Sequence, residues 1–176
     1  LMTGASSWED SADLAHQLEG AGFGGMLYPE TTQVPWMQIA AASMAAPSLF
    51  FTPGIAVAFP RSPMLSAAMA YEIAGNTGGR FRLGLGSQVK AHVERRYSSE
   101  FDRPAARMRD YVEAVKACWR AFNREERLSH DGEFYSMSLL PPDWAPRPHE
   151  HDMKVDISAV GPMMTKVAAQ VADGVH

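Results

Sequence analysis

The sequence predicts an α/β fold built on a parallel β-sheet. Short apolar segments alternate with longer segments in which apolar residues recur every three or four positions, which is the period of an amphipathic helix. The short segments are apolar on both faces, as expected of parallel strands that helices cover on either side. Glycine and proline separate the segments. This pattern fits an open doubly wound sheet and a closed barrel equally well.

The first elements are the end of one strand, a helix and a second strand. Leu1–Gly4 has the character of a strand that is already under way, so we expect the start of the domain to be missing. A helix follows to about Gly20, with Ser7 or Asp10 suited to cap its N-terminus. The next strand is expected over residues 23–28.

A second helix and a third strand follow. The alanine-rich helix spans 36–46 and ends at Pro47, because proline disfavours helical geometry in the residue before it. The strand over 49–58 is interrupted by Pro53 and Gly54. Since proline donates no hydrogen bond to a neighbouring strand, this interruption predicts a bulge.

The centre of the sequence combines a helix with the most informative strand. Ser62 followed by Pro63 is a typical helix start, and the glycines of 75–79 end that helix. Phe81–Leu85 then predicts a short buried strand. A polar, basic segment after it opens another helix.

The last third of the sequence holds the longest helix and an insertion. The helix is expected over 103–122, where apolar residues recur with helical spacing. Residues 123–153 are expected to be an irregular insertion within a single domain that spans 1–176. A strand over 155–160 and a further helix follow, and 173–176 begins a sixth strand.

Composition narrows the functional classes. The chain has 176 residues, enough for one domain, and a net charge of −4, which argues against nucleic-acid and anionic membrane partners. No segment predicts a membrane span or a signal peptide, so we expect a cytoplasmic protein. Cys118 is the only cysteine. His149, His151 and Asp152 do not have the spacing of a usual metal site, so no metal is expected.

One stretch carries a family resemblance. Gly78–Ser87 (GGRFRLGLGS) resembles the fourth strand of the bacterial luciferase-like monooxygenase superfamily, and Gln88–Lys90, His92 and Glu94–Arg96 bring it closer to a branch that uses the deazaflavin coenzyme F-420. The resemblance covers the whole chain but only about five-eighths of the family's barrel. It implies a partial (β/α) TIM barrel, with parallel strands one to five and the start of strand six.

The resemblance also implies an activity. We expect an oxidoreductase that transfers a hydride between coenzyme F-420 and a small organic substrate, and that forms a homodimer when full length. The alternatives are a monooxygenase that uses flavin mononucleotide (FMN) and a barrel fragment without catalytic activity. Open strand edges and uncovered apolar faces would favour association of such a fragment.

At the end of the second strand, the resemblance implies two site residues. Glu30 corresponds to an acidic residue of the F-420 relatives and is our first catalytic candidate. Trp36 corresponds to a tryptophan of those relatives and is a cofactor-binding candidate, with helix packing as the alternative. Thr31 replaces the histidine of those relatives, and Ser87 replaces the catalytic glutamate of the sugar-phosphate dehydrogenase branch. Both replacements argue against that substrate class.

The next two strands provide cofactor-binding candidates. Gly54–Ile55 aligns with a family bulge in which a non-proline cis peptide backs the deazaflavin ring, so we expect a cis bond there. Gly86 leaves room for a flat ring or a phosphate, because it carries no side chain. Ser87 and Gln88 can form hydrogen bonds with a ring edge or carbonyl.

Basic residues follow these candidates. Lys90, with Arg95 or Arg96 nearby, suits the phosphate or acidic tail of F-420, although a solvated basic face is the simpler interpretation of the two arginines. Histidine is the side chain best suited to exchange a proton near neutral pH, so His92 is the second catalytic candidate.

The fifth strand leads into a last candidate site. Val160 and Gly161 stand at a predicted helix N-terminus, where free backbone N–H groups suit a phosphate or carboxylate. Because ligands of parallel α/β proteins bind at the carboxyl ends of the strands, we expect Glu30, Gly54, Gly86 and Gly161 to lie at one end of the sheet.

Overall fold

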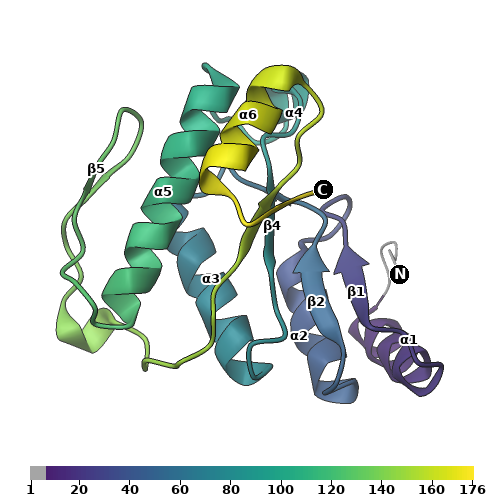
Figure 1. Cartoon of the computed structure of the whole chain (residues 1–176). Coiled ribbons are helices and arrows are strands. Elements are labelled where there is room, and N and C mark those ends of the chain that lie inside the picture. Colours follow the sequence, from purple (N-terminus) through teal and green to yellow (C-terminus); the bar gives the residue numbers. More distant parts are fainter. Residues whose placement is uncertain (1–6) are drawn as a thin grey trace.

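A computed structural model of the chain describes residues 7–176, so the strand end expected at Leu1–Gly4 lies outside the described residues. The parallel strands follow one another in sequence order and form a two-stranded sheet and a four-stranded sheet (Figure 1). They are β1 (Gly25–Tyr28), β2 (Phe50–Pro53), β3 (Ala56–Val57), β4 (Leu83–Gly86), β7 (Val155–Ile157) and β8 (Gly174–Val175).

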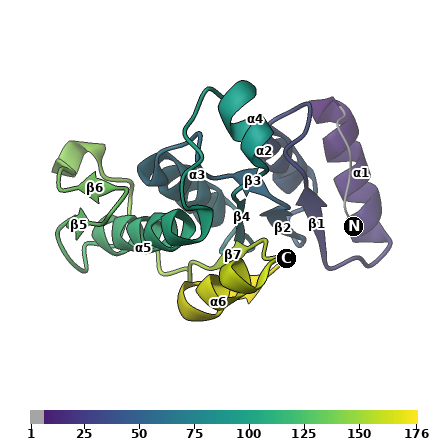
Figure 2. The same cartoon turned by 90° about the horizontal axis from the view of Figure 1, so that it is seen from above.

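The helices lie outside the arc that the strands form, as the view from above shows (Figure 2). They are α1 (Trp8–Gly20), α2 (Pro35–Ala45), α3 (Pro63–Asn76), α4 (Lys90–Arg95), α5 (Pro104–Phe122) and α6 (Pro162–Val171). The arc is not closed, so the architecture is a partial barrel, as predicted. None of the helices between residues 7 and 176 is long and apolar enough to cross a membrane.

Local sequence explains where the helices begin. The Ser7 hydroxyl accepts a hydrogen bond from the backbone N–H of Asp10 at 3.0 Å, and the Asp10 carboxylate accepts one in return from the Ser7 N–H at 3.2 Å. This reciprocal capping satisfies N–H groups that have no partner within the helix. The Ser62 hydroxyl caps α3 by accepting a hydrogen bond from the backbone N–H of Leu65 at 3.2 Å, without a return bond, and Pro63 takes the first helical position.

The interruption expected within 49–58 separates β2 from β3. The Gly54–Ile55 peptide is cis, which confirms the cis bond expected at this position. Beyond it the chain leaves β1 and pairs with β4 instead. An isolated bridge between Phe51 and Phe81 joins β2 to the segment that leads into β4, so the arc is continuous.

The expectation of an irregular segment over 123–153 was wrong in part. This segment contains an antiparallel hairpin of β5 (His130–Asp131) and β6 (Ser136–Met137), followed by the 3-10 helix η1 (Pro142–Trp144). The hairpin lies beside α5 (Figure 1). Its strands are too short for alternation of apolar and polar residues to produce a recognisable pattern.

Residues of β4 alternate between the core and the inside of the arc. Leu83 and Leu85 are fully buried members of the hydrophobic core. Successive side chains of a strand point to opposite faces, so the residues between them face the concave side. They are Arg82, just before β4, and Gly84 and Gly86 within it.

Candidate functional site

A pocket of about 360 Å³ lies at the carboxyl ends of β4 and β7. It brings together Ile55, Gly86, Ser87, Gln88, Val160 and Gly161 from the sequence-predicted residues, and adds Val89, Ser158 and Met164. Its volume is within the range of roughly 300–1,000 Å³ that is typical of small-molecule sites. Its position is the one at which barrel enzymes build their active sites.

One wall of the pocket depends on the close approach of Ile55 to β4. A Cβ atom at Gly86 would lie 2.7 Å from both Cγ1 and Cδ1 of Ile55, closer than such atoms approach in proteins. Glycine at this position therefore lets the Ile55 side chain rest directly on the strand. Gly54 is equally confined, with a Cβ position 2.2 Å from the Leu27 side chain, but it does not line the pocket.

The opposite side of the pocket is the N-terminus of α6. Gly161 is the N-cap residue, and Pro162 in the first position has no N–H to leave unpaired. No atom lies within 4 Å of the Cβ position of Gly161, so the space beside this helix end is open. The N–H groups of a first helical turn have no partner within the helix and attract anions. These features fit the phosphate of a flavin or deazaflavin cofactor.

The backbone at the pocket mouth is unusual at Gln88. Its φ angle is +58°, in the left-handed region that residues other than glycine seldom adopt. The Ser87 hydroxyl donates to the Gln88 carbonyl at 3.2 Å, and the Gln88 Oε1 accepts from the Val89 N–H at 3.0 Å. These local bonds turn the chain sharply between β4 and α4.

Glu30 lies just beyond the carboxyl end of β1, outside the pocket. Its carboxylate accepts bonds from Arg61 Nη1 at 2.8 Å and Nη2 at 2.5 Å, and a third from the Val57 N–H at 2.8 Å. Its side chain is only 3% exposed. The geometry thus gives Glu30 a holding role that the sequence did not indicate, and its catalytic role stays a prediction.

Trp36 is a core residue at the start of α2. Its ring lies 6.3 Å from that of Phe81 and is 4% exposed, and it does not line the pocket. Within residues 7–176, its buried Nε1 has no hydrogen-bond partner. Contact of Trp36 with a coenzyme stays a prediction.

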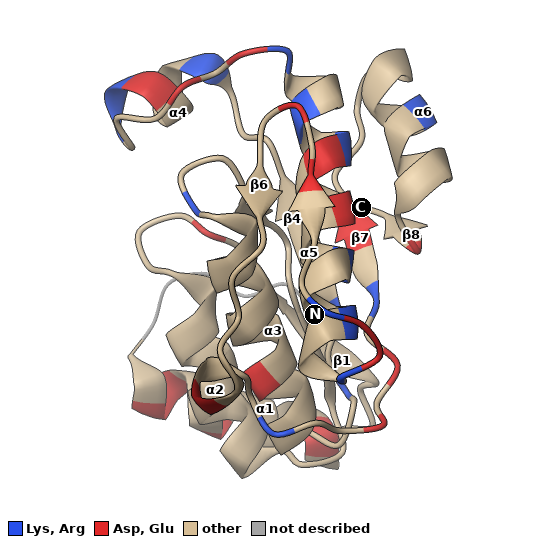
Figure 3. Cartoon of the chain, turned by 90° about the vertical axis from the view of Figure 1, so that its left-hand side faces the viewer, with Lys and Arg blue, Asp and Glu red and all other residues tan. Residues whose placement is uncertain are grey.

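Figure 3 shows basic residues on α4 in blue. They are exposed and do not line the pocket. Lys90 pairs loosely with Glu94, with 3.7 Å between Nζ and Oε1, and Arg96 donates to the carbonyl of Thr31. His92 is also exposed on this helix. The tail-binding and proton-transfer roles expected of this group stay predictions.

Sequence reasoning missed a polar cluster inside the arc. Arg82 donates to both carboxylate oxygens of Asp156, at 2.8 and 2.5 Å, and His176 Nε2 lies 4.0 Å from the same carboxylate. The carboxylate partner raises the pKa of Arg82. A signal was present, because Asp156 is a charged residue in the middle of an otherwise apolar strand.

The fold is that of a partial (β/α)-barrel, with a pocket at the strand ends. The profile of the luciferase-like monooxygenase family matches residues 1–176, and the chain belongs to this family. The members described below include enzymes named for F-420 and for monooxygenase activity.

Curated relatives come mainly from mycobacteria. The uncharacterised protein Rv1360 of Mycobacterium tuberculosis is 37% identical over 165 residues, which are 93% of this chain and 48% of the relative. Rv3520c of the same species, named as a putative coenzyme F-420-dependent oxidoreductase, is 32% identical over 123 residues, covering 65% of this chain and 35% of that protein. The 5,10-methylenetetrahydromethanopterin reductase of Archaeoglobus fulgidus is 30% identical and covers 70% of this chain and 34% of its own length. The chain spans about half the length of the first of these relatives.

Solved structures agree on the fold. The monooxygenase RslO1 of Streptomyces bottropensis superposes with a TM-score of 0.78 and 22% identity, covering 96% of this chain and 52% of that one. The F-420-dependent tetrahydromethanopterin reductase of Methanopyrus kandleri gives 0.75 and 17%, with coverage of 99% and 54%. The FMN complex of a 3,6-diketocamphane monooxygenase component from Pseudomonas putida gives 0.74 and 16%, with coverage of 95% and 51%.

Proposed function

We propose that the full-length protein is an oxidoreductase that transfers a hydride between coenzyme F-420 and a small organic substrate. The observation that carries this proposal is the pocket, in which a backbone wall at Gly86 faces the open N-terminus of α6 at Gly161. A flat ring needs the first feature, and a phosphate needs the second. We further propose that the full-length protein works as a homodimer.

Each side of the pocket would have a separate task. Ile55 and the Gly86 backbone would support one face of the coenzyme ring, and Ser87 and Gln88 would offer polar atoms to its edge. The N-terminus of α6 would hold the phosphate. When bound, the coenzyme supplies the hydride chemistry, while the protein orients the ring and excludes water from one face.

Two observations favour F-420 over FMN. Two of the curated relatives described above are an oxidoreductase named for F-420 and a methanopterin reductase. In addition, Lys90 and Arg95 of α4 and Arg96 just after it are exposed on the segment that follows β4, and the F-420 tail is more negatively charged than the single phosphate of FMN. An FMN-dependent monooxygenase is the second candidate, because a structural neighbour binds FMN.

A fluorescence titration of the full-length protein with F-420 and with FMN, at low and high salt, tests the choice. We expect tighter binding of F-420, with an advantage that shrinks as salt screens the basic residues. Equal affinity for both cofactors, or tight binding of FMN alone, would overturn this proposal in favour of the monooxygenase.

A matched pair of variants tests the pocket itself. Both Gly161 and Gly24 have no atom within 4 Å of the Cβ position apart from their chain neighbours, so a side chain can begin at either place without a clash at its Cβ. Gly161→Val would obstruct the α6 N-terminus, and we expect roughly a tenfold loss of cofactor affinity, or about 1.4 kcal/mol. Gly24→Val, which lies before β1, should bind within about twofold of the parent protein. Unchanged affinity in Gly161→Val would mean that the cofactor binds elsewhere.

A further inference from the structure

Residues on the concave faces of β4, β7 and β8 lie side by side in levels, because the strands are paired in a fixed register. Gly84, Asp156 and Gly174 are register partners on these three strands. The strands are parallel, so residues two positions further along face the same side at the next level. These residues are Gly86, Ser158 and His176, and the first two line the pocket. The backbone pairing reaches this level, because the N–H of Ser158 donates to Leu85 and that of His176 to Ile157. His176 therefore stands at the same level as Gly86 and Ser158, next to the pocket, although it is not one of the residues that line it.

The imidazole of His176 leans across the strands toward β4. A Cβ atom at Gly84 would lie 2.6 Å from its Nε2 and 2.0 Å from the Pro53 carbonyl oxygen. The missing side chain of Gly84 thus creates the space that the imidazole occupies. Only 23% of the His176 side chain is exposed.

The charged groups that face this imidazole are Asp156 from β7 and Arg82 from the start of β4. Asp156 lies 4.0 Å from His176 Nε2, and its side chain is 9% exposed. Arg82 holds both oxygens of that carboxylate and thereby fixes its orientation. The Arg82 side chain is 37% exposed, so the pair is only partly buried, and it holds the carboxylate beside the histidine.

We propose that His176, positioned by Asp156, exchanges the proton that accompanies hydride transfer; this inference rests on the proposed function. When a substrate hydroxyl group is oxidised to a carbonyl, the C–H bond breaks and its hydrogen leaves as a hydride to the coenzyme. The O–H proton then passes to the neutral imidazole. In the reverse direction, the imidazolium returns one proton to the carbonyl oxygen as the carbon receives the hydride.

Chemical modification of the full-length protein tests this placement. Diethyl pyrocarbonate reacts with neutral imidazole, and peptide mass spectrometry measures the rate at each histidine. We expect saturating F-420, or FMN where that binds, to slow modification of His176 at least about fivefold. His16, which is exposed on α1, serves as the control and should react equally fast with and without cofactor. Equal modification of His176 in the presence of bound cofactor would overturn the proposal.

The pH dependence of the same reaction tests the proton role. We expect the pH profile of His176 modification to move to lower pH in Asp156→Asn, because a nearby carboxylate favours the charged imidazole. His176→Gln should still bind the cofactor within about twofold. A pH profile that Asp156→Asn leaves unchanged would contradict the inference. Failure of the parent protein to bind either cofactor would instead refute the proposed function. The pH profiles of His176 modification in the parent protein and in Asp156→Asn would still report on the histidine–carboxylate pair.

Discussion

Arg61 holds the carboxylate of Glu30 through two parallel hydrogen bonds, at 2.5 and 2.8 Å. The same carboxylate accepts the backbone N–H of Val57 in β3. Three donors therefore converge on one buried acid, and this ties the chain after β1 to β3 and to the start of the next loop. A planar guanidinium matches a carboxylate in this way, which a lysine would not do.

We predict that Glu30→Gln is mainly a stability variant. Replacing the carboxylate leaves the Arg61 charge, which is 16% exposed, without its partner, and removing one member of a buried pair costs about 3 kcal/mol or more. Urea unfolding of the full-length protein measures this loss. Cofactor affinity, measured at a temperature where the variant is folded, should stay near the parent value.

Glu94→Gln is the matched control. Glu94 also pairs with a cation, Lys90, but at 3.7 Å and with 42% of its side chain exposed, so we expect a change below about 1 kcal/mol. If Glu30→Gln kept its stability and lost only turnover, Glu30 would be a catalytic acid rather than a structural one.

Two glycines of β4 should respond differently to alanine. At Gly84 the new methyl group would meet the backbone oxygen of Pro53 at 2.0 Å, which cannot yield without moving a strand. At Gly86 it would meet only the side chain of Ile55 at 2.7 Å, which can rotate into the pocket. We expect Gly84→Ala to cost about 3 kcal/mol and Gly86→Ala about 1 kcal/mol, the latter with clearly weaker cofactor binding.

Thermal unfolding and cofactor titration of both variants separate these effects. If Gly86→Ala bound the cofactor as tightly as the parent protein, the wall formed by Ile55 and Gly86 would not be part of the site.

The two glycines also show how far the sequence predicts the site. Glycine after a short buried strand is visible in the sequence, and the pocket residues follow from the rule that barrel sites lie at strand ends. What Gly84 accommodates was not visible, because Pro53 and His176 approach it only once three strands are in register. Contacts of that kind depend on the tertiary arrangement and leave no local pattern.

The same distinction explains the fate of Glu30 and Trp36. Glu30 follows the end of β1 and Trp36 lies at the start of α2, as the sequence predicts. A residue's position along the chain does not say which way its side chain turns. Glu30 turns to Arg61, which follows β3, and Trp36 turns to Phe81, just before β4. Neither partner could be assigned from spacing alone.

Cys118 should be unreactive in the folded protein. Burial raises the pKa of its thiol from an ordinary value of 9.0 to about 12, because the thiolate is poorly solvated inside α5. Iodoacetamide at pH 8 should therefore label Cys118 only after the protein is unfolded in urea. Rapid labelling of the native protein would show that α5 opens locally.

The raised pKa also predicts a loss of stability at high pH. Between pH 9 and about 12 the folded thiol keeps a proton that the unfolded thiol releases, so the free energy of unfolding falls as pH rises through this window. Tyr28, whose pKa burial raises to about 12, adds to the fall from pH 10 upward. Cys118→Ala should flatten the curve in part, and an identical pH dependence in this variant would contradict the assignment.

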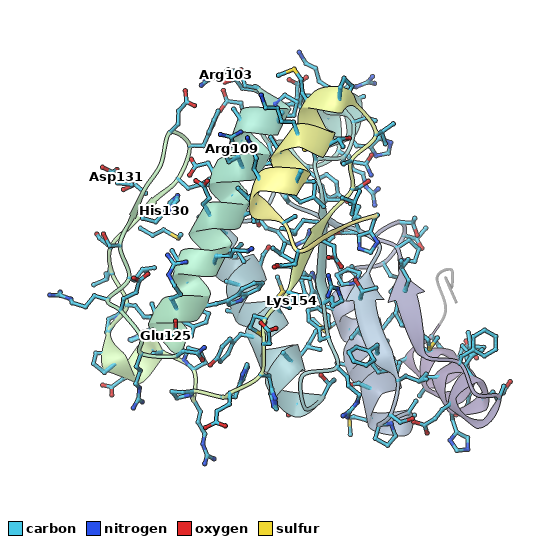
Figure 4. The ribbon with its side chains drawn as sticks, viewed as in Figure 1. Arg103, Arg109, Glu125, His130, Asp131 and Lys154 are labelled. Atoms are coloured by element: carbon cyan, nitrogen blue, oxygen red, sulfur yellow. The ribbon has the colours of Figure 1, made fainter. Side chains whose placement is uncertain are left out.

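The hairpin of β5 and β6 should depend on one carboxylate of α5. Asp110, which is 6% exposed, accepts bonds from His130 Nε2 at 2.6 Å and from the N–H groups of Phe134 and Tyr135 at 2.5 and 3.1 Å. His130 points toward α5, whereas Asp131 points away from it (Figure 4). A Cβ atom at Gly132 would lie 1.8 Å from the Asp110 carboxylate, so only glycine permits this approach.

We therefore expect Asp110→Ala to release the hairpin from α5 while the barrel strands stay folded. Three donors lose their acceptor, each at a cost of about 1 kcal/mol or more unless water replaces it, and detachment lets water do so. Hydrogen exchange and limited proteolysis over 130–137 should rise sharply in Asp110→Ala but not in Asp131→Ala, because Asp131 is exposed. Protection that persists in Asp110→Ala would show that apolar contacts of Tyr135 and Met137 with the core, rather than the carboxylate, hold the hairpin in place.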